Sequence, residues 1–110
     1  MSVTLTVVDG QPAVELVDHA GECWAYRYVI VADVPGRFAV KLTKLGDPDE
    51  PTYLVQIGTN WHRCDCPNFV YRREVRVDGC KHVKLVRDKD VRALLRMLSA
   101  TVPQKEARRA

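Results

Sequence analysis

The sequence has 110 residues, 46% of them hydrophobic and 28% charged, and a formal net charge of +3 at pH 7. This length is typical of one small domain, and there is no run of about 18 apolar residues that would predict a membrane-spanning helix. Met1 is followed by neither the basic start nor the apolar stretch of a signal peptide. We therefore expect a cytoplasmic protein with reduced cysteines and no membrane partner.

The first 60 residues predict a series of strands, because apolar residues alternate with polar ones between turn residues. The expected strands cover residues 3–7, a segment that ends at Leu16, and residues 24–30, 38–43 and 53–57. Turns are expected at residues 9–12, at Pro35-Gly36 and in the loop of residues 46–51. Strands joined in this way are typical of an antiparallel meander, which we predict for this half of the sequence.

The last of these strands leads through Gly58-Thr59-Asn60 into Trp61 and on to the first of two cysteine pairs. The spacing is Cys64-x-Cys66-x13-Cys80-x-His82. Three thiolates and an imidazole in two tight pairs are the ligand set of a tetrahedral zinc site, so we predict one structural zinc ion.

Each pair predicts its own local structure. Residues two apart on an extended strand project from the same face, so Cys64 and Cys66 can grip one ion while Asp65 points away. A two-residue step within a helix rotates by about 200°, so Cys80 must lie at the helix entrance with His82 in the first turn. Asp78 and Gly79 would supply the preceding turn, and the positive end of the helix dipole favours a thiolate at Cys80.

A helix is expected after Cys80, because apolar residues recur at helical steps. The stripe consists of Val83, Val86, Leu94, Leu95 and Leu98, with Val91 and Met97 beside it. Residues 87–90 interrupt the stripe and Asp90 could cap a second helix, so one bent helix and two short helices both remain open. Pro103 is expected to stop the helix.

The residues around the ligands resemble the SWIM zinc finger, a family with the motif C-x-C-x(n)-C-x-H. Pro67 and Phe69 follow the first pair as they do in that family, and the resemblance covers roughly residues 52–98. It implies a small strand-strand-helix unit around one structural zinc, with Cys64, Cys66, Cys80 and His82 as its ligands. Members of the family bind DNA or proteins.

Several other residues near the pairs have simpler explanations. Cys23 is expected to be a buried thiol in a strand, and His62 is a weaker candidate ligand than His82 because its spacing does not fit. Trp61 and Phe69 are expected to pack around the zinc and shield it. Tyr71 either stacks on a nucleic-acid base or fills the small core.

Charge is distributed unevenly along the sequence. Residues 1–60 contain 4 Lys or Arg against 8 Asp or Glu, a balance of −4, whereas residues 61–110 contain 13 against 6, a balance of +7. The expected phosphate contacts are Arg72, Arg73 and Arg76 in the loop between the ligand pairs and Lys81 and Lys84 on the helix. This basic face predicts binding to nucleic acid, most simply DNA. The alternatives are a solvated face that offsets the charge of the zinc site, and a protein-protein interaction adaptor with a purely structural zinc.

Catalysis is not expected. A fully occupied set of three cysteines and one histidine leaves no open position for water or substrate, and no phosphate loop or dinucleotide motif is present. We expect neither catalytic residues nor a small-molecule substrate.

Together these patterns predict an α+β protein in which an N-terminal antiparallel sheet is followed by a ββα zinc finger with a C-terminal helix. The expected parts are a β scaffold over residues 1–51, the finger over residues 52–98 and a basic, frayed tail over residues 99–110. Loss of any ligand is expected to unfold residues 61–98, because metal-free fingers rarely form.

Overall fold

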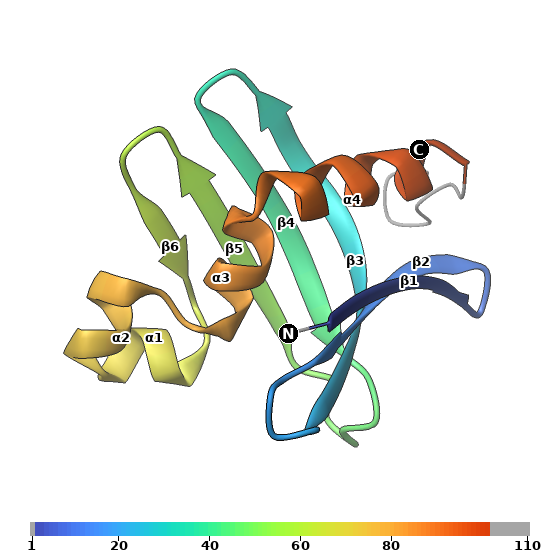
Figure 1. Cartoon of the computed structure of the whole chain (residues 1–110), viewed down its shortest axis with the longest axis horizontal. Coiled ribbons are helices and arrows are strands. Elements are labelled where there is room, and N and C mark those ends of the chain that lie inside the picture. The colour runs from blue at the N-terminus through green and yellow to red at the C-terminus, as the bar shows by residue number, and fades with distance from the viewer. Residues whose placement is uncertain (1, 102–110) are drawn as a thin grey trace.

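The computed structural model describes residues 2–101, which form one antiparallel sheet followed by helices (Figure 1). The strands are β1 (Ser2–Val8), β2 (Gln11–Val17), β3 (Cys23–Val34), β4 (Arg37–Lys44), β5 (Thr52–Gly58) and β6 (His62–Cys64). They lie in the sheet in chain order, each antiparallel to the next. The predicted α+β class and the predicted meander are both confirmed.

Turn chemistry explains the first hairpins. Asp9 and Gly10 both have positive φ, 54° and 76°, as the two central residues of a tight hairpin turn require. Pro35-Gly36 joins β3 to β4, with Gly36 at φ 84°. Between residues 2 and 101 the outer strands β1 and β6 do not pair with each other, so the sheet is open.

The helices are α1 (Pro67–Tyr71), α2 (Arg73–Asp78), α3 (Lys81–Arg87) and α4 (Lys89–Thr101). In Figure 1, α3 and α4 lie across one face of the sheet, while α1 and α2 lie beside the β6 edge. None of these helices is both long and apolar enough to cross a membrane.

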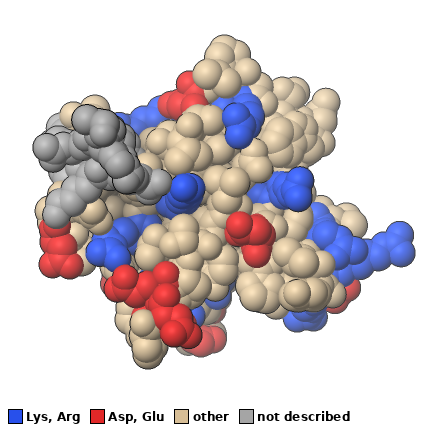
Figure 2. Space-filling view, turned by 180° about the vertical axis from the view of Figure 1, so that it is seen from behind, with Lys and Arg blue, Asp and Glu red and all other residues tan. Residues whose placement is uncertain are grey.

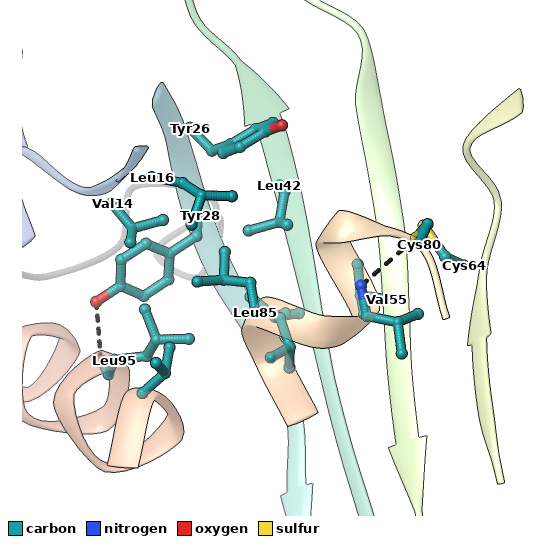
Figure 3. Close-up of a cluster of buried hydrophobic side chains, with 14 of the residues drawn as sticks. Val14, Leu16, Tyr26, Tyr28, Leu42, Val55, Cys64, Cys80, Leu85 and Leu95 are labelled. Atoms are coloured by element: carbon teal, nitrogen blue, oxygen red, sulfur yellow. Dashed lines mark hydrogen bonds between the residues drawn. The ribbon is translucent and has the colours of Figure 1, made fainter. Parts of the chain in front are cut away.

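The core lies between this face of the sheet and helices α3 and α4. It contains fully buried side chains of Tyr28, Leu42 and Val55 from the strands and of Leu85 and Leu95 from the helices (Figure 3). The Tyr28 hydroxyl donates a hydrogen bond of 2.8 Å to the carbonyl of Leu95, so the one polar atom of this side chain is satisfied inside the core. Both helices are therefore packed into the same core as the strands.

Two predicted details of the second half are corrected. The segment between the ligand pairs is not a plain loop but the two short helices α1 and α2. Of the two helical alternatives, the chain adopts two helices, and the break is capped by Asp88 rather than Asp90. Asp88 Oδ1 accepts from the backbone N–H groups of Asp90 at 2.8 Å and Val91 at 3.3 Å, and Asp90 lies in the first turn of α4.

The sheet and helix α4 each continue across a boundary between the expected parts of the chain. β5 and β6 belong to the same sheet as the first four strands, because β5 pairs with β4 along its whole length. α4 extends to Thr101, beyond residue 98. The remainder of the predicted tail, with Pro103, lies outside the described residues.

Candidate metal centre

Cys64, Cys66, Cys80 and His82 converge on one point, where the end of β6 meets the starts of α1 and α3. One ligand atom from each residue lies within 4.8 Å of all the others, and all four residues are buried. Figure 3 shows Cys64, at the end of β6, and Cys80, before α3, facing each other. The donor set, its burial and its convergence fit a single metal ion.

Three short elements place these side chains. Cys64 is the last residue of β6, and Cys66 is still extended, with φ −70° and ψ 155°, as the N-cap of α1. Asp65 points away as predicted, and its Oδ1 accepts a 2.8 Å hydrogen bond from the backbone N–H of Leu54. Cys80 is the N-cap of α3, and His82 is the second residue of that helix, so the predicted placement of this pair is confirmed.

Two separations between ligand atoms match the edges of a tetrahedral site. With metal–sulfur bonds of about 2.3 Å, the edges of a tetrahedral zinc site are about 3.6–3.8 Å long. His82 Nδ1 lies 3.8 Å from Cys64 Sγ and 3.7 Å from Cys80 Sγ. These separations are long for hydrogen bonds and suit two ligands of a shared ion.

Each sulfur accepts a backbone N–H group. Cys64 accepts from Cys66, Cys66 accepts from Phe69, and Cys80 accepts from Val83 at 3.5 Å. A hydrogen bond to sulfur favours the thiolate, because the charged form is the better acceptor. The backbone is thus arranged for thiolates before any side chain contributes.

The thiols share protons unequally in the metal-free state. A hydrogen bond from the Cys64 thiol, assisted by His82 and the N–H group of Val83, lowers the pKa of Cys80 to about 3. Donation to Cys80 and burial raise the pKa of Cys64, and burial raises the pKa of Cys66. Three buried thiolates in contact repel one another, so a cation is needed for all three to ionise.

The imidazole of His82 is held by two tyrosines. Its Nε2 lies 3.0 Å from the hydroxyl of Tyr26, so Nδ1 faces the sulfurs while Nε2–H has a partner. The pKa of Tyr26 is raised, mainly by burial and secondly by the nearby Tyr53. Its hydroxyl therefore remains neutral and can accept a hydrogen bond. The Tyr53 ring lies over the imidazole, with centroids 4.9 Å apart.

The tyrosines are the functional residues that sequence reasoning missed. Tyr26 and Tyr53 lie in the predicted strands of residues 24–30 and 53–57, but their role beside His82 was not anticipated. The available signal was the phenol itself, because a buried hydroxyl needs a hydrogen-bond partner.

The other residues singled out near the site have different outcomes. His62 is not a ligand, since its Nε2 lies 2.8 Å from the carbonyl of Arg76. Phe69 is buried as predicted and packs edge-on against His62. The expectation for Trp61 is wrong: the side chain is 46% exposed and lies over Gly58, where a Cβ atom would collide with the indole. Cys23 is exposed at the start of β3, and its predicted burial is also wrong.

The five residues predicted to contact phosphate lie on or next to α2 and α3, and most have local partners. Arg72 pairs with Glu74 at 3.4 Å and Lys84 pairs with Asp78 at 3.0 Å. Arg76 donates to the carbonyl of Val70, Lys81 lies over the Trp24 ring at 4.1 Å, and Arg73 is exposed. Figure 2 shows basic side chains gathered toward the edge of the molecule that carries α1 and α2, with acidic side chains interspersed elsewhere.

An open cavity of about 740 Å³ adjoins the metal centre on this side. Its lining includes Trp61, His62, Arg63, Phe69, Val70 and Arg76. It therefore offers an aromatic face and two guanidinium groups to a partner.

Comparison with protein families, curated proteins and solved structures finds no match for this chain. The geometry of the site is thus the basis on which a function can be assigned.

Proposed function

We propose that this protein is a non-catalytic zinc-binding module of the SWIM type that binds nucleic acid, most simply DNA, through the basic face around its zinc site. The observation that carries the proposal is the convergence of Cys64, Cys66, Cys80 and His82 within 4.8 Å. Soft thiolates together with an imidazole in a closed tetrahedral set favour zinc over the harder divalent ions.

The zinc has a structural role in this proposal. Its ligands come from the end of β6, the start of α1 and the start of α3, so one ion would tie these elements together. Four protein ligands leave no coordination position for water or substrate, which supports a non-catalytic module.

Support for the SWIM type comes from the motif and its placement together. The first pair begins at the last residue of a strand, and Cys80 and His82 lie at the entrance of a helix, which suits the strand-strand-helix unit of that family. The segment between the pairs is helical in this chain.

Nucleic acid is the partner that the surface chemistry supports best. Tyr71 is 82% exposed and directly precedes Arg72 and Arg73, and Trp61 is half exposed beside Arg63. Exposed aromatic rings among guanidinium groups can stack on bases while the cations contact phosphates.

A protein partner is the second candidate, and the exposed apolar surface of the short helices favours it. Val77 is 76% exposed and Val70 is 44% exposed. The ion pairs of Arg72 and Lys84 also offset part of the charge that would otherwise attract phosphate.

The two candidates differ in their response to salt. Binding of a fluorescent DNA duplex is measured by anisotropy between about 50 and 200 mM salt. If all five predicted cations contact phosphate, the slope of log K against log salt is about −4.5. The Arg72→Gln, Arg73→Gln double variant should reduce the slope by about 2, whereas Arg27→Gln, a control on β3, should leave it unchanged. A slope near zero, or the same slope in the double variant as in the wild type, would reject the nucleic-acid interface and leave the protein adaptor.

A further inference from the structure

We propose that a second site, at the opposite end of strand β6 from Cys64, binds a phosphate group. The site is a cavity of about 420 Å³ between the β3–β4 turn, the β5–β6 turn and α4. In Figure 1 these two turns project from the same end of the sheet. Arg37, at the start of β4, and Arg92 and Arg96, on α4, line the cavity.

Each guanidinium group is held by neighbours that occupy only some of its donors. Arg37 donates from Nε and Nη2 to Gln56 Oε1, at 3.3 and 3.1 Å. Arg96 donates from Nε and Nη2 to the two carboxylate oxygens of Asp33, at 2.7 and 3.0 Å. Within residues 2–101, no hydrogen bond uses Nη1 of either arginine, so these donors are available to a ligand.

Arg92 is held from the opposite side. Its Nη1 donates to the backbone carbonyls of Val86 at 2.9 Å and Arg87 at 2.7 Å, which are among the last carbonyls of α3. Its Nε and Nη2 have no hydrogen bond among the described residues. The three groups are thus oriented before a ligand arrives, which reduces the entropy lost on binding.

The charge of the cavity matches a dianion. Three guanidinium groups and the single carboxylate of Asp33 give a local balance of +2. A phosphate monoester carries a charge of about −1.5 to −2 at neutral pH, and guanidinium forks match its oxygens in bidentate pairs. Phe38 and Ile57 add an apolar wall, which suits a phosphate attached to an organic group rather than a bare ion.

This site is separate from the proposed zinc module. None of its lining residues is a metal ligand, and none belongs to the five cations assigned to the nucleic-acid interface. The shared chemistry is a terminal phosphate, carried either by a free nucleotide or by the 5′ end of a nucleic acid.

The first test follows backbone amide resonances of the full, zinc-loaded chain by NMR during titration with inorganic phosphate at pH 8. We expect shifts centred on Gly36, Gly58 and Thr59, which line the cavity. Arg37→Gln and Arg96→Gln should each weaken binding by about tenfold, because each removes a charged donor. Arg27→Gln is the charge-matched control and should retain wild-type affinity. Shifts centred elsewhere, or equal affinity in all variants, would overturn the proposal.

The second test identifies the source of the phosphate. AMP is compared with adenosine, and an oligonucleotide with a 5′-phosphate is compared with the same oligonucleotide lacking it. Stronger binding of AMP or of the phosphorylated oligonucleotide supports the site and names its source, whereas no preference in either pair overturns it. The Arg72→Gln, Arg73→Gln variant should keep this phosphate preference, so failure of the DNA interface is distinguishable from failure of this site.

Discussion

The hydroxyl of Tyr26 lies 3.0 Å from Nε2 of His82, and this contact connects the middle of the sheet to the metal cluster. Tyr26 comes from β3 and is fully buried, 56 residues before its partner. It fixes the orientation of the imidazole, so that Nδ1 faces Cys64 and Cys80.

Tyr26→Phe should lower the zinc affinity by about 10- to 100-fold, because partners of this kind fix the tautomer and the orientation of a ligating histidine. Affinity is measured by competition with a chromophoric chelator. The matched control is Tyr28→Phe. Tyr28 lies two residues after Tyr26 on β3, and its substitution removes the hydrogen bond to the carbonyl of Leu95. It should lower the free energy of unfolding by about 1 kcal/mol and leave zinc affinity unchanged. Equal zinc affinities in the two variants would contradict the role given to Tyr26.

Cys80→Ser should abolish stoichiometric zinc after dialysis against a weak chelator. The loss of a metal ligand belongs to the class of changes that lower stability by about 4 kcal/mol or more. Metal content is determined by elemental analysis and stability by thermal unfolding. Cys23→Ser serves as the control, since Cys23 is exposed and lies outside the cluster. Full zinc content in Cys80→Ser would remove Cys80 from the ligand set.

Zinc binding should weaken as the pH falls. The pKa values of Cys64 and Cys66 are raised in the metal-free site, so both thiols hold protons at pH 7, whereas the low pKa of Cys80 leaves it ionised. The metal-bound state therefore carries fewer protons, and lower pH favours the metal-free state. Displacement of two protons changes the affinity by about a hundredfold per pH unit. Chelator competition between pH 6 and pH 8 measures this slope, and an affinity independent of pH would contradict it.

Removal of zinc should have a local effect. α1 and α2 have only five and six residues, and Phe69 is the one buried side chain that they contribute. α3 and α4, in contrast, bury Val83, Leu85 and Leu95 in the sheet core. We expect EDTA to destroy amide hydrogen-exchange protection in residues 62–79, which include β6, while strands β1 to β5 and helix α4 stay protected. The region expected to unfold is therefore smaller than residues 61–98, the range expected from the sequence. Loss of protection in residues 80–98 as well would restore the wider prediction.

The predictable part of this protein follows from local chemistry. Alternation marked the strands, and the turns at Asp9 and at Pro35-Gly36 lie where their residues favour them. The helical period of the Cys80–His82 pair placed Cys80 at a helix entrance without any tertiary information. The ligand spacing likewise predicted that the four candidate ligands converge, and in the structure they do.

The errors come from interactions that are distant in sequence or that compete locally. Asp88 and Asp90 can both cap a helix, and the choice between them depends on how α3 ends against the sheet. The exposure of Cys23 could not be predicted from the strand pattern, because Cys23 is the first residue of β3. The contact between Tyr26 and His82 depends on where α3 packs relative to β3, and this tertiary arrangement is not encoded in any local pattern.

The chain-order arrangement of the strands has a consequence for how the protein is made. Every strand pairs with its neighbour in sequence, so each hairpin can close as soon as it leaves the ribosome. Among residues 2–101, the helices that cover the apolar face of that sheet are α3 and α4, which are synthesised after all six strands. During that interval the nascent sheet presents the side chains of Tyr28, Leu42 and Val55 to other proteins, and chains that terminate before residue 81 should associate through this face and be removed by proteolysis.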